Sequence, residues 1–133
     1  MSDAATQLEL HALVAKFANS FDLKDWQALG ECLADSVYVD YSELRGTPAE
    51  TLTREQFVAP RREGMVNLKT HHLAGNIESK IEGSHADLKV SMMVVIVKPD
   101  GERISAHCVY FMNAARGDGG WRFVDIRQKV LIK

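Results

Sequence analysis

Long β-prone segments separated by short turn motifs fill the second half of this sequence, and they restrict the possible folds more than any other feature. The segments span residues 69–82, 85–98, 103–115 and 121–132. The turns between them are Gly83-Ser84, Pro99-Asp100-Gly101 and Gly117-Asp118-Gly119-Gly120. Such residues form tight hairpin turns, and strands joined by hairpins pair antiparallel. The sequence therefore predicts a meander of long antiparallel strands.

The first half of the chain is mainly helical. Apolar residues recur at helical spacing from Leu8 to Phe21 and predict a long amphipathic helix. A second helix is predicted from a cap at Asp25 to about Ala34, and a third from about Thr53 to Met65, with a short strand over Val37–Tyr41 between them. Helices followed by a meander indicate an α+β fold whose helices cover one face of the sheet.

Size, charge and cysteine usage narrow the class of protein. The 133 residues suit one domain spanning 1–133. A net charge of −2 argues against a nucleic-acid partner. The longest basic run, Arg61-Arg62, is too short for such a partner, and we expect it on a solvated helix face.

The amino terminus lacks a secretory pattern, and no apolar stretch approaches the roughly 20 residues of a membrane span. Cys32 and Cys108 lack CxxC spacing, which indicates reduced thiols. We expect a cytoplasmic protein without membrane contact.

Two of the predicted strands carry apolar residues at successive positions, Met92–Val97 and Val109–Met112. This pattern is typical of strands that are covered on both faces. Because the helices cover one face, a partner subunit is expected on the other, and the chain is predicted to form a homo-oligomer. Alternation along the strand places Cys108 and Tyr110 on one face and His107 on the other.

Two short segments far apart in the chain, Phe21–Trp26 and Lys69–Asn76, contain the groups of an acid–base pair. If the fold brings Asp22 against His72, the carboxylate fixes one imidazole tautomer and leaves the other nitrogen free to accept a proton near neutral pH. Two structural alternatives remain. Asp22 can satisfy backbone amides at a helix end, and His72 can be a hydrogen-bonded strand histidine.

Adjacent His71 and His72 also raise the question of a metal. Successive side chains of a strand point to opposite faces, so the two imidazoles do not readily share one ion. No carboxylate–histidine spacing elsewhere supports a metal site. We expect neither a metal nor a cofactor.

The alternation of the strand that carries His72 is internally inconsistent. If His72 faces the core, Asn76 does too, whereas Ile77 and Ile81 have the character of core residues. A bulge or bend near Gly75 would switch the faces, and Asn76 would then be a further polar group of the site. The alternative is a strand that is covered on both sides.

Four motifs in order carry a family resemblance. They are Asp22-x-x-Asp25-Trp26, Val39-Asp40-Tyr41-Ser42, Thr70-His71-His72-Leu73-Ala74-Gly75 and Gly120-Trp121-Arg122-Phe123. Together they resemble the SnoaL-like branch of the nuclear transport factor 2-like (NTF2-like) superfamily, and within it scytalone dehydratase and related dehydratases and dehydrochlorinases. The resemblance implies a cone of strongly bent mixed or antiparallel sheet, packed against three N-terminal helices around an apolar pocket. It also implies dimers or trimers that form through the outer sheet face.

The resemblance further implies roles for individual residues. Asp22 and His72 occupy the positions of the family's acid–base dyad, and Tyr41 that of a pocket tyrosine which polarises the substrate. Cys108 and Tyr110 are implied to line the pocket, and His107 would then lie on the outer face, toward a subunit interface.

Two departures from scytalone dehydratase accompany these matches. Phe21 stands where that enzyme has a second pocket tyrosine, and Phe21 is therefore expected to contact the substrate without polarising it. The second catalytic histidine, expected on the following strand, falls among the apolar residues Val94–Val97.

The residues suit removal of a proton from carbon. His72 would accept the proton, Asp22 would stabilise the imidazolium, and Tyr41 would donate to the oxygen where charge develops. The sequence therefore predicts a cofactor-free lyase, of dehydratase or dehydrohalogenase type, acting on a hydrophobic and cyclic small molecule. The alternatives are an isomerase or cyclase of the same fold, and a non-catalytic small-molecule-binding or assembly domain.

Overall fold

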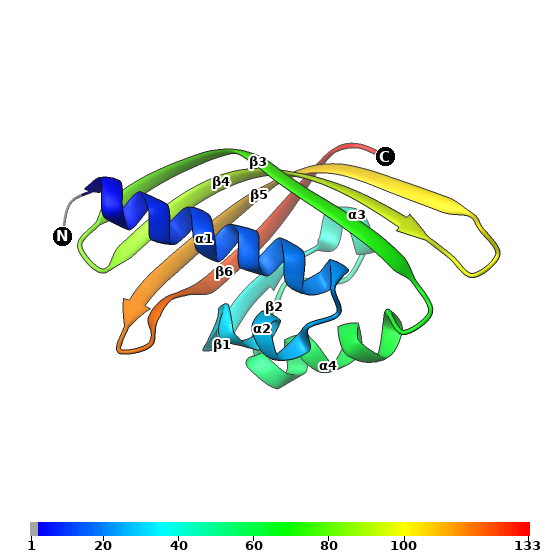
Figure 1. Cartoon of the computed structure of the whole chain (residues 1–133), viewed down its shortest axis with the longest axis horizontal. Coiled ribbons are helices and arrows are strands. Elements are labelled where there is room, and N and C mark those ends of the chain that lie inside the picture. The colour runs from blue at the N-terminus through cyan, green and yellow to red at the C-terminus, as the bar shows by residue number, and fades with distance from the viewer. Residues whose placement is uncertain (1–2) are drawn as a thin grey trace.

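A strongly curved, open sheet of six strands forms the centre of the fold, and the long helix α1 (Asp3–Asp22) crosses one of its faces (Figure 1). The computed structural model describes residues 3–133. The strand order in the sheet is β2-β1-β6-β5-β4-β3. The predicted α+β class is confirmed, with helices and sheet in separate layers.

The predicted meander forms the larger part of the sheet. Its strands are β3 (Lys69–Glu82), β4 (His85–Val97), β5 (Arg103–Gly117) and β6 (Gly120–Ile132), and they pair antiparallel in sequence order. Strand β1 (Leu33–Asp40) adds to the sheet in parallel with β6 and pairs antiparallel with β2 (Glu50–Thr53). The sheet is therefore mixed, with one parallel junction next to the meander.

The three predicted helices are α1, α2 (Trp26–Glu31) and α4 (Arg54–Gly64). The Asp25 carboxylate accepts from the Ala28 N–H at 3.0 Å, and Thr53 forms a capping box with Gln56, so both predicted caps are confirmed. The predicted end of α2 near Ala34 was wrong. The backbone turns into β1 earlier because the Cys32 carbonyl accepts a hydrogen bond from the Phe123 N–H of β6, at 2.8 Å.

Two short elements were not predicted, namely the single helical turn α3 (Ser42–Arg45) and strand β2. Each has four residues, which is too short for a hydrophobic period to be visible. The turn α3 ends at Gly46 in the left-handed conformation, with φ of 72°, as glycine allows. Together they lead the chain away from Tyr41 and back along the edge of β1.

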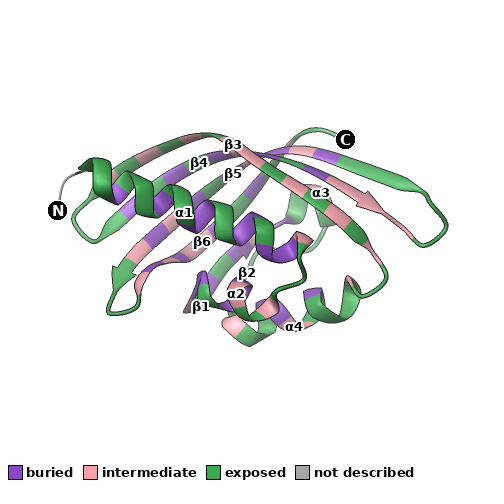
Figure 2. Ribbon diagram, viewed as in Figure 1, coloured by how far each residue is buried: buried purple, intermediate pink, exposed green. Residues whose placement is uncertain are grey.

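The apolar core lies between the helices and the sheet, and α1 contributes a buried stripe to it (Figure 2). The Phe17 ring makes edge-to-face contacts with Phe21 at 5.2 Å and with Phe123 of β6 at 5.4 Å between ring centroids. These contacts fix the end of α1 against the sheet and thereby position Asp22, its last residue.

One expectation about α4 was wrong. The basic pair Arg61-Arg62 was predicted to lie on a solvated helix face, but Arg61 is only 7% exposed. Arg61 follows the buried Phe57 by four residues and therefore lies on the same, inner face of the helix. Arg62 alone is exposed, and it pairs with Glu55 at 2.9 Å.

Strand β3 contains the bulge that its sequence suggested. Its pairing with β4 shifts between Gly75 and Glu78, and Asn76 takes a positive φ of 47°. Before the bulge His72 faces the inner side, and after it Ile77 does, while Asn76 is exposed. The irregularity lets both His72 and the later isoleucines face the helices.

The positive φ of Asn76 gives a stability prediction. Asn76→Val should lower the free energy of unfolding by roughly 1–2 kcal/mol, because a β-branched side chain fits the left-handed region poorly. Asn76→Gly should not destabilise the fold in this way. Chemical denaturation measures both values. Glu78→Val, at an exposed position just after the bulge, is the matched control, and an equal loss there would contradict the explanation.

No helix within residues 3–133 is long and apolar enough to cross a membrane.

Candidate active site

The structure brings Asp22, at the end of α1, against the inner face of β3. Its carboxylate accepts three hydrogen bonds from that strand. The Thr70 hydroxyl donates to Oδ1 at 2.9 Å and the His72 backbone N–H donates to Oδ2 at 2.7 Å. His72 Nδ1 lies 2.7 Å from Oδ1. The carboxylate thus joins two elements that are 50 residues apart in the chain.

These three donors hold the Asp22 carboxylate at the carboxyl end of α1. The carboxyl end of a helix disfavours a negative charge, since the helix dipole is negative there. Hydrogen bonds from Thr70 and from two N–H groups of His72 offset this repulsion. Thr70 was not singled out by the sequence analysis. Its only sequence signal is its position two residues before His72, on the same face of the strand.

The same geometry fixes the tautomer of His72. An ionised carboxylate only accepts hydrogen bonds, so the Asp22 contact places the imidazole hydrogen on Nδ1. Nε2 then carries the free lone pair. The arrangement can chemically provide a base whose orientation is set by its carboxylate partner.

Phe21 holds the other side of the imidazole. Its ring stacks on His72, with centroids 4.9 Å apart and an interplanar angle of 22°. The His72 side chain is 10% exposed and that of Asp22 is 14% exposed. The pair is therefore largely withdrawn from water, although not sealed from it.

Burial and the carboxylate act on His72 in opposite directions. Burial lowers the pKa of the imidazole from its ordinary value of 6.5. The hydrogen bond and the negative charge of Asp22 raise the pKa, but by less than burial lowers it, so it stays below 6.5. His72 is consequently neutral at pH 7. A neutral imidazole is the form that accepts a proton.

A pH titration tests this balance. The pKa of His72, followed by NMR, should lie below 6.5 in the native protein. In Asp22→Asn it should be lower still, because the charge that favours the imidazolium is gone. Comparison with spectra of His72→Gln assigns the resonance. A pKa above 6.5 in the native protein, or a higher one in Asp22→Asn, would contradict the account.

The lowered pKa also links His72 to stability. The native state binds the proton less readily than the unfolded chain, so this residue's contribution is fully present above about pH 6.5. It is lost as the pH falls from there through the native pKa.

Cys108 and Tyr110 lie on the same sheet face as His72. The register pairs Cys108 with Met92 and Tyr110 with Val90, and all four residues are buried. Burial raises the pKa of the Cys108 thiol, which leaves it protonated and poorly nucleophilic. His107 falls on the opposite face, as alternation predicted.

Gln128 of β6 is a polar residue of this interior that the sequence analysis missed. It is 7% exposed, and its Nε2 donates to the Tyr110 hydroxyl at 2.9 Å. Its Oε1 is buried without a hydrogen-bond partner among the described residues. An unsatisfied buried amide oxygen is costly, and a ligand that donates a hydrogen bond would satisfy it. The only sign of this role in the sequence is that Gln128 falls at an inward-facing position of β6. Its hydrogen bond to Tyr110 depends on how β5 and β6 are paired, which the sequence does not reveal.

Tyr41 lies elsewhere in the interior. It follows β1, which three strands separate from β3 in the sheet. Its ring is 6.3 Å from that of Tyr110 and 6.4 Å from that of Phe57, between centroids. Burial raises its pKa, so its hydroxyl is a neutral donor at pH 7. No sequence pattern indicated its other neighbours, the guanidinium groups of Arg45 and Arg61, each centred 5.2 Å from the ring centroid.

Asn76 is not brought to this region. Its side chain is exposed beyond the bulge, and its Nδ2 lies 3.5 Å from Ser91 Oγ. The bulge that turns Ile77 inward turns Asn76 outward. We therefore do not retain it in the candidate site.

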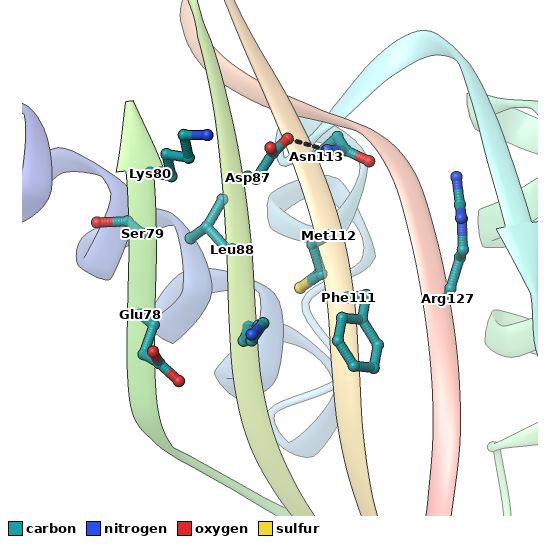
Figure 3. Close-up of a pocket in the computed structure, with 10 residues that line it drawn as sticks. Glu78, Ser79, Lys80, Asp87, Leu88, Phe111, Met112, Asn113 and Arg127 are labelled. Carbon is teal, nitrogen blue, oxygen red and sulfur yellow. Dashed lines mark hydrogen bonds between the residues drawn. The ribbon is translucent and has the colours of Figure 1, made fainter. Parts of the chain in front are cut away.

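Several hollows mark the surface of the molecule. The largest that we describe, of about 530 Å³, lies on the sheet face opposite α1. Figure 3 shows its lining of charged side chains around Phe111, with Asn113 donating to Asp87. A hollow of about 300 Å³ includes Tyr41. Of the hollows described, this is the one that contains a predicted site residue.

Comparisons with known proteins agree with this architecture. A curated scytalone dehydratase-like protein of Claviceps purpurea is 27% identical over 137 residues, covering 90% of this chain and 83% of that protein. The scytalone dehydratase-like protein mdpB of Emericella nidulans is 30% identical over 136 residues, covering 90% and 61%. The scytalone dehydratase-like protein claB of Passalora fulva is 33% identical over 72 residues, covering 51% of this chain and 44% of that protein. The match thus spans less than two thirds of the length of the latter two.

Solved structures show the same fold. The Kfla4162 protein of Kribbella flavida superposes with a TM-score of 0.92 at 23% identity, covering 98% of this chain and 94% of that one. A hexachlorocyclohexane dehydrochlorinase, LinA type 2, superposes with a TM-score of 0.83 at 14% identity, covering 97% and 87%. At such identities the likeness establishes the fold alone. The model of the SnoaL-like domain family matches residues 2–127, and the chain therefore belongs to this NTF2-like family.

Proposed function

We propose that this protein is a cofactor-free lyase that removes a proton from carbon and expels a β-hydroxyl or β-halide from a hydrophobic, cyclic small molecule. The observation that carries the proposal is the hydrogen bond between Asp22 and His72 at 2.7 Å, which leaves Nε2 of His72 as the base. The names of the curated relatives and of the LinA structure support the same type of reaction.

The charges of the reaction fit the site. As Nε2 takes the proton, His72 becomes an imidazolium, and the Asp22 carboxylate stabilises it. In a dehydration the imidazolium would return this proton to the departing hydroxyl, which leaves as water, whereas a halide leaves as the anion. The lowered pKa keeps His72 unprotonated beforehand. Tyr41 and Tyr110 are buried neutral hydroxyls that we propose as donors to the oxygen where negative charge develops. Gln128, hydrogen-bonded to Tyr110, would orient that hydroxyl.

The lining favours an apolar substrate. Met92, Val94 and Cys108 occupy the inner sheet face next to His72, and all are buried. Phe21 adds an aromatic ring beside the imidazole. A hydrophobic ring system would match these walls, whereas a strongly charged substrate would be poorly solvated by them.

An elimination assay tests the proposal. Scytalone and hexachlorocyclohexane, the compounds in the relatives' names, are incubated with the protein in D₂O. NMR then follows the loss of substrate and the exchange of acidic C–H hydrogens. We expect elimination or exchange with at least one compound, absent in His72→Gln. Failure of the native protein to act on either, in the presence of demonstrated binding, would count against the lyase and favour the alternative below.

A non-catalytic binding domain is the second candidate. It is favoured by the fact that neither Asp22 nor His72 lines any of the four hollows described. In that case a ligand would bind with equal affinity to the native protein and to His72→Gln, without being converted.

We also propose that a second copy of the chain covers the outer sheet face. Leu73, Met93 and Phe111 of that face are 57%, 47% and 39% exposed. The groove beside Phe111 is lined by side chains of both charges, namely Glu78, Lys80, Asp87, Lys89 and Arg127. Mixed charges around an apolar centre are self-complementary, as an interface between identical subunits requires.

Light scattering tests this assembly. The native protein should have a mass that is a multiple of 14.8 kDa, and Phe111→Glu should shift it toward the monomer, because a charge would be buried in the interface. Leu23→Glu, at a position 78% exposed between α1 and α2, is the matched control and should leave the mass unchanged. A native monomer would rule out the proposal.

A further inference from the structure

The inner face of α4 contains a buried cation that the proposed reaction does not use. Arg61 is 7% exposed, and its guanidinium carbon lies 3.6 Å from the centroid of the Phe57 ring. Its Nη1 donates to the Phe57 carbonyl at 2.7 Å. Within residues 3–133 no carboxylate forms an ion pair with it. Buried arginines are normally paired with an anion, since desolvating an unpaired charge is unfavourable.

A second arginine lies nearby. The guanidinium carbons of Arg45 and Arg61 are each 5.2 Å from the centroid of Tyr41, so two cations share one ring. Arg45 is exposed, at the end of α3. Cation–π attraction offsets part of their repulsion, but neutral rings do not neutralise two positive charges. Burial and the positive charge of Arg45 also lower the pKa of Arg61. A bound anion would have the opposite effect, because it would favour the charged guanidinium.

A hollow of suitable size adjoins these groups. Its volume is about 300 Å³, and both arginines and Tyr41 line it. The other walls include the apolar side chains Val39, Leu52, Pro48 and Pro60. Glu50 also lines it, without an ion pair to either arginine among the described residues. This volume is at the lower limit for small-molecule sites and suits a ligand with a single ring.

We propose that Arg61, with Arg45 and Tyr41, forms a binding site for the carboxylate of a small apolar or aromatic acid. A guanidinium fork binds a planar carboxylate through two parallel hydrogen bonds. The apolar walls would hold the body of the acid. This site goes beyond the proposed elimination, and it would stand even if His72 were not a base.

Calorimetric titration of the full chain tests the proposal, with benzoate as the probe. Benzamide, which has the same shape without the charge, and inorganic phosphate are the comparison ligands. Benzoate should bind at least ~10-fold more tightly than either, since only benzoate combines a planar anion with an apolar ring. Equal binding of benzamide would overturn the role of charge. Equal binding of phosphate would overturn the assignment to organic acids.

Variants locate the site. Arg61→Gln should weaken benzoate binding at least ~10-fold, and Arg45→Gln by a smaller factor. Arg62→Gln, which alters the exposed neighbour on the same helix, is the matched control and should bind as the native protein does. If Arg61→Gln fails to fold, Arg45→Gln decides, because Arg45 is exposed. Unchanged affinity in Arg45→Gln and in any folded Arg61→Gln would overturn the proposal.

The outcome does not depend on the base His72, although Tyr41 takes part in both proposals. His72→Gln should bind benzoate as tightly as the native protein does, since the described contacts of the two arginines are with Phe57 and Tyr41 and do not include the imidazole. Loss of benzoate binding in His72→Gln would place the acid at the Asp22–His72 pair instead and would overturn the separate site.

Discussion

His72→Gln is expected to lower kcat for elimination or proton exchange by roughly 10³–10⁴-fold, toward the upper end of what a general base contributes. Glutamine keeps a polar side chain on β3, but it has no nitrogen lone pair that accepts a proton near neutral pH. The backbone N–H of residue 72 still donates to Asp22 Oδ2 in this variant. The loss should therefore appear in kcat, with KM changed much less.

His71→Gln is the matched control for this experiment. His71 is the preceding residue of the same strand, and its side chain is exposed on the opposite face. It should retain native turnover. Thermal unfolding of both variants shows whether the fold is intact. If folded His72→Gln turns over at the native rate, the base lies elsewhere and the proposed mechanism is wrong.

Asp22→Asn should lower kcat by roughly 10²-fold or more, but by less than His72→Gln does, because the base itself remains. The amide has one acceptor oxygen, whereas the carboxylate accepts from Thr70 and from both N–H groups of His72. The introduced amide can present its N–H₂ toward Nδ1, which favours the wrong tautomer of the imidazole. The imidazolium formed in the reaction also loses its countercharge.

The same change should weaken the fold. Removing a charge-assisted acceptor from three part-buried donors should lower the free energy of unfolding by about 1–3 kcal/mol, measured by chemical denaturation. Asp25→Asn is the matched control, because asparagine caps α2 as well as aspartate does and Asp25 does not contact His72 in the described structure. Native turnover in Asp22→Asn, or an equal loss in Asp25→Asn, would refute the assigned role of the carboxylate.

The Asp22–His72 pair and the Arg45–Arg61 pair differ in the sign of their net charge. The Asp22–His72 pair carries the single negative charge of its carboxylate, which can balance a proton on the imidazole. The Arg45–Arg61 pair around Tyr41 carries two cations that form no ion pair among the described residues, although Glu50 lines the same hollow. The first arrangement suits transfer of a proton, and the second suits retention of an anionic group. The mutational tests separate them.

Local patterns in the chain were enough to predict the α+β class, the antiparallel meander and the opposite faces of β5 on which Cys108 and Tyr110, and His107, lie. Hairpin turns and alternation are local properties, so they can be recognised in one segment at a time. A bulge near Gly75 was one of two explanations that the change in parity of the apolar residues left open, and the pairing of β3 with β4 contains it. The caps at Asp25 and Thr53 were likewise local signals, each contained within four residues of the chain.

Features that depend on segments far apart in the chain became visible only in three dimensions. Burial of Arg61 results from the packing of α4, and the unpaired oxygen of Gln128 results from the register between β5 and β6. Tyr41 has two arginines beside it because α3 and α4 converge there. Such contacts join surfaces that no local pattern relates, and the electrostatic environment of a buried group is set by all of its neighbours together.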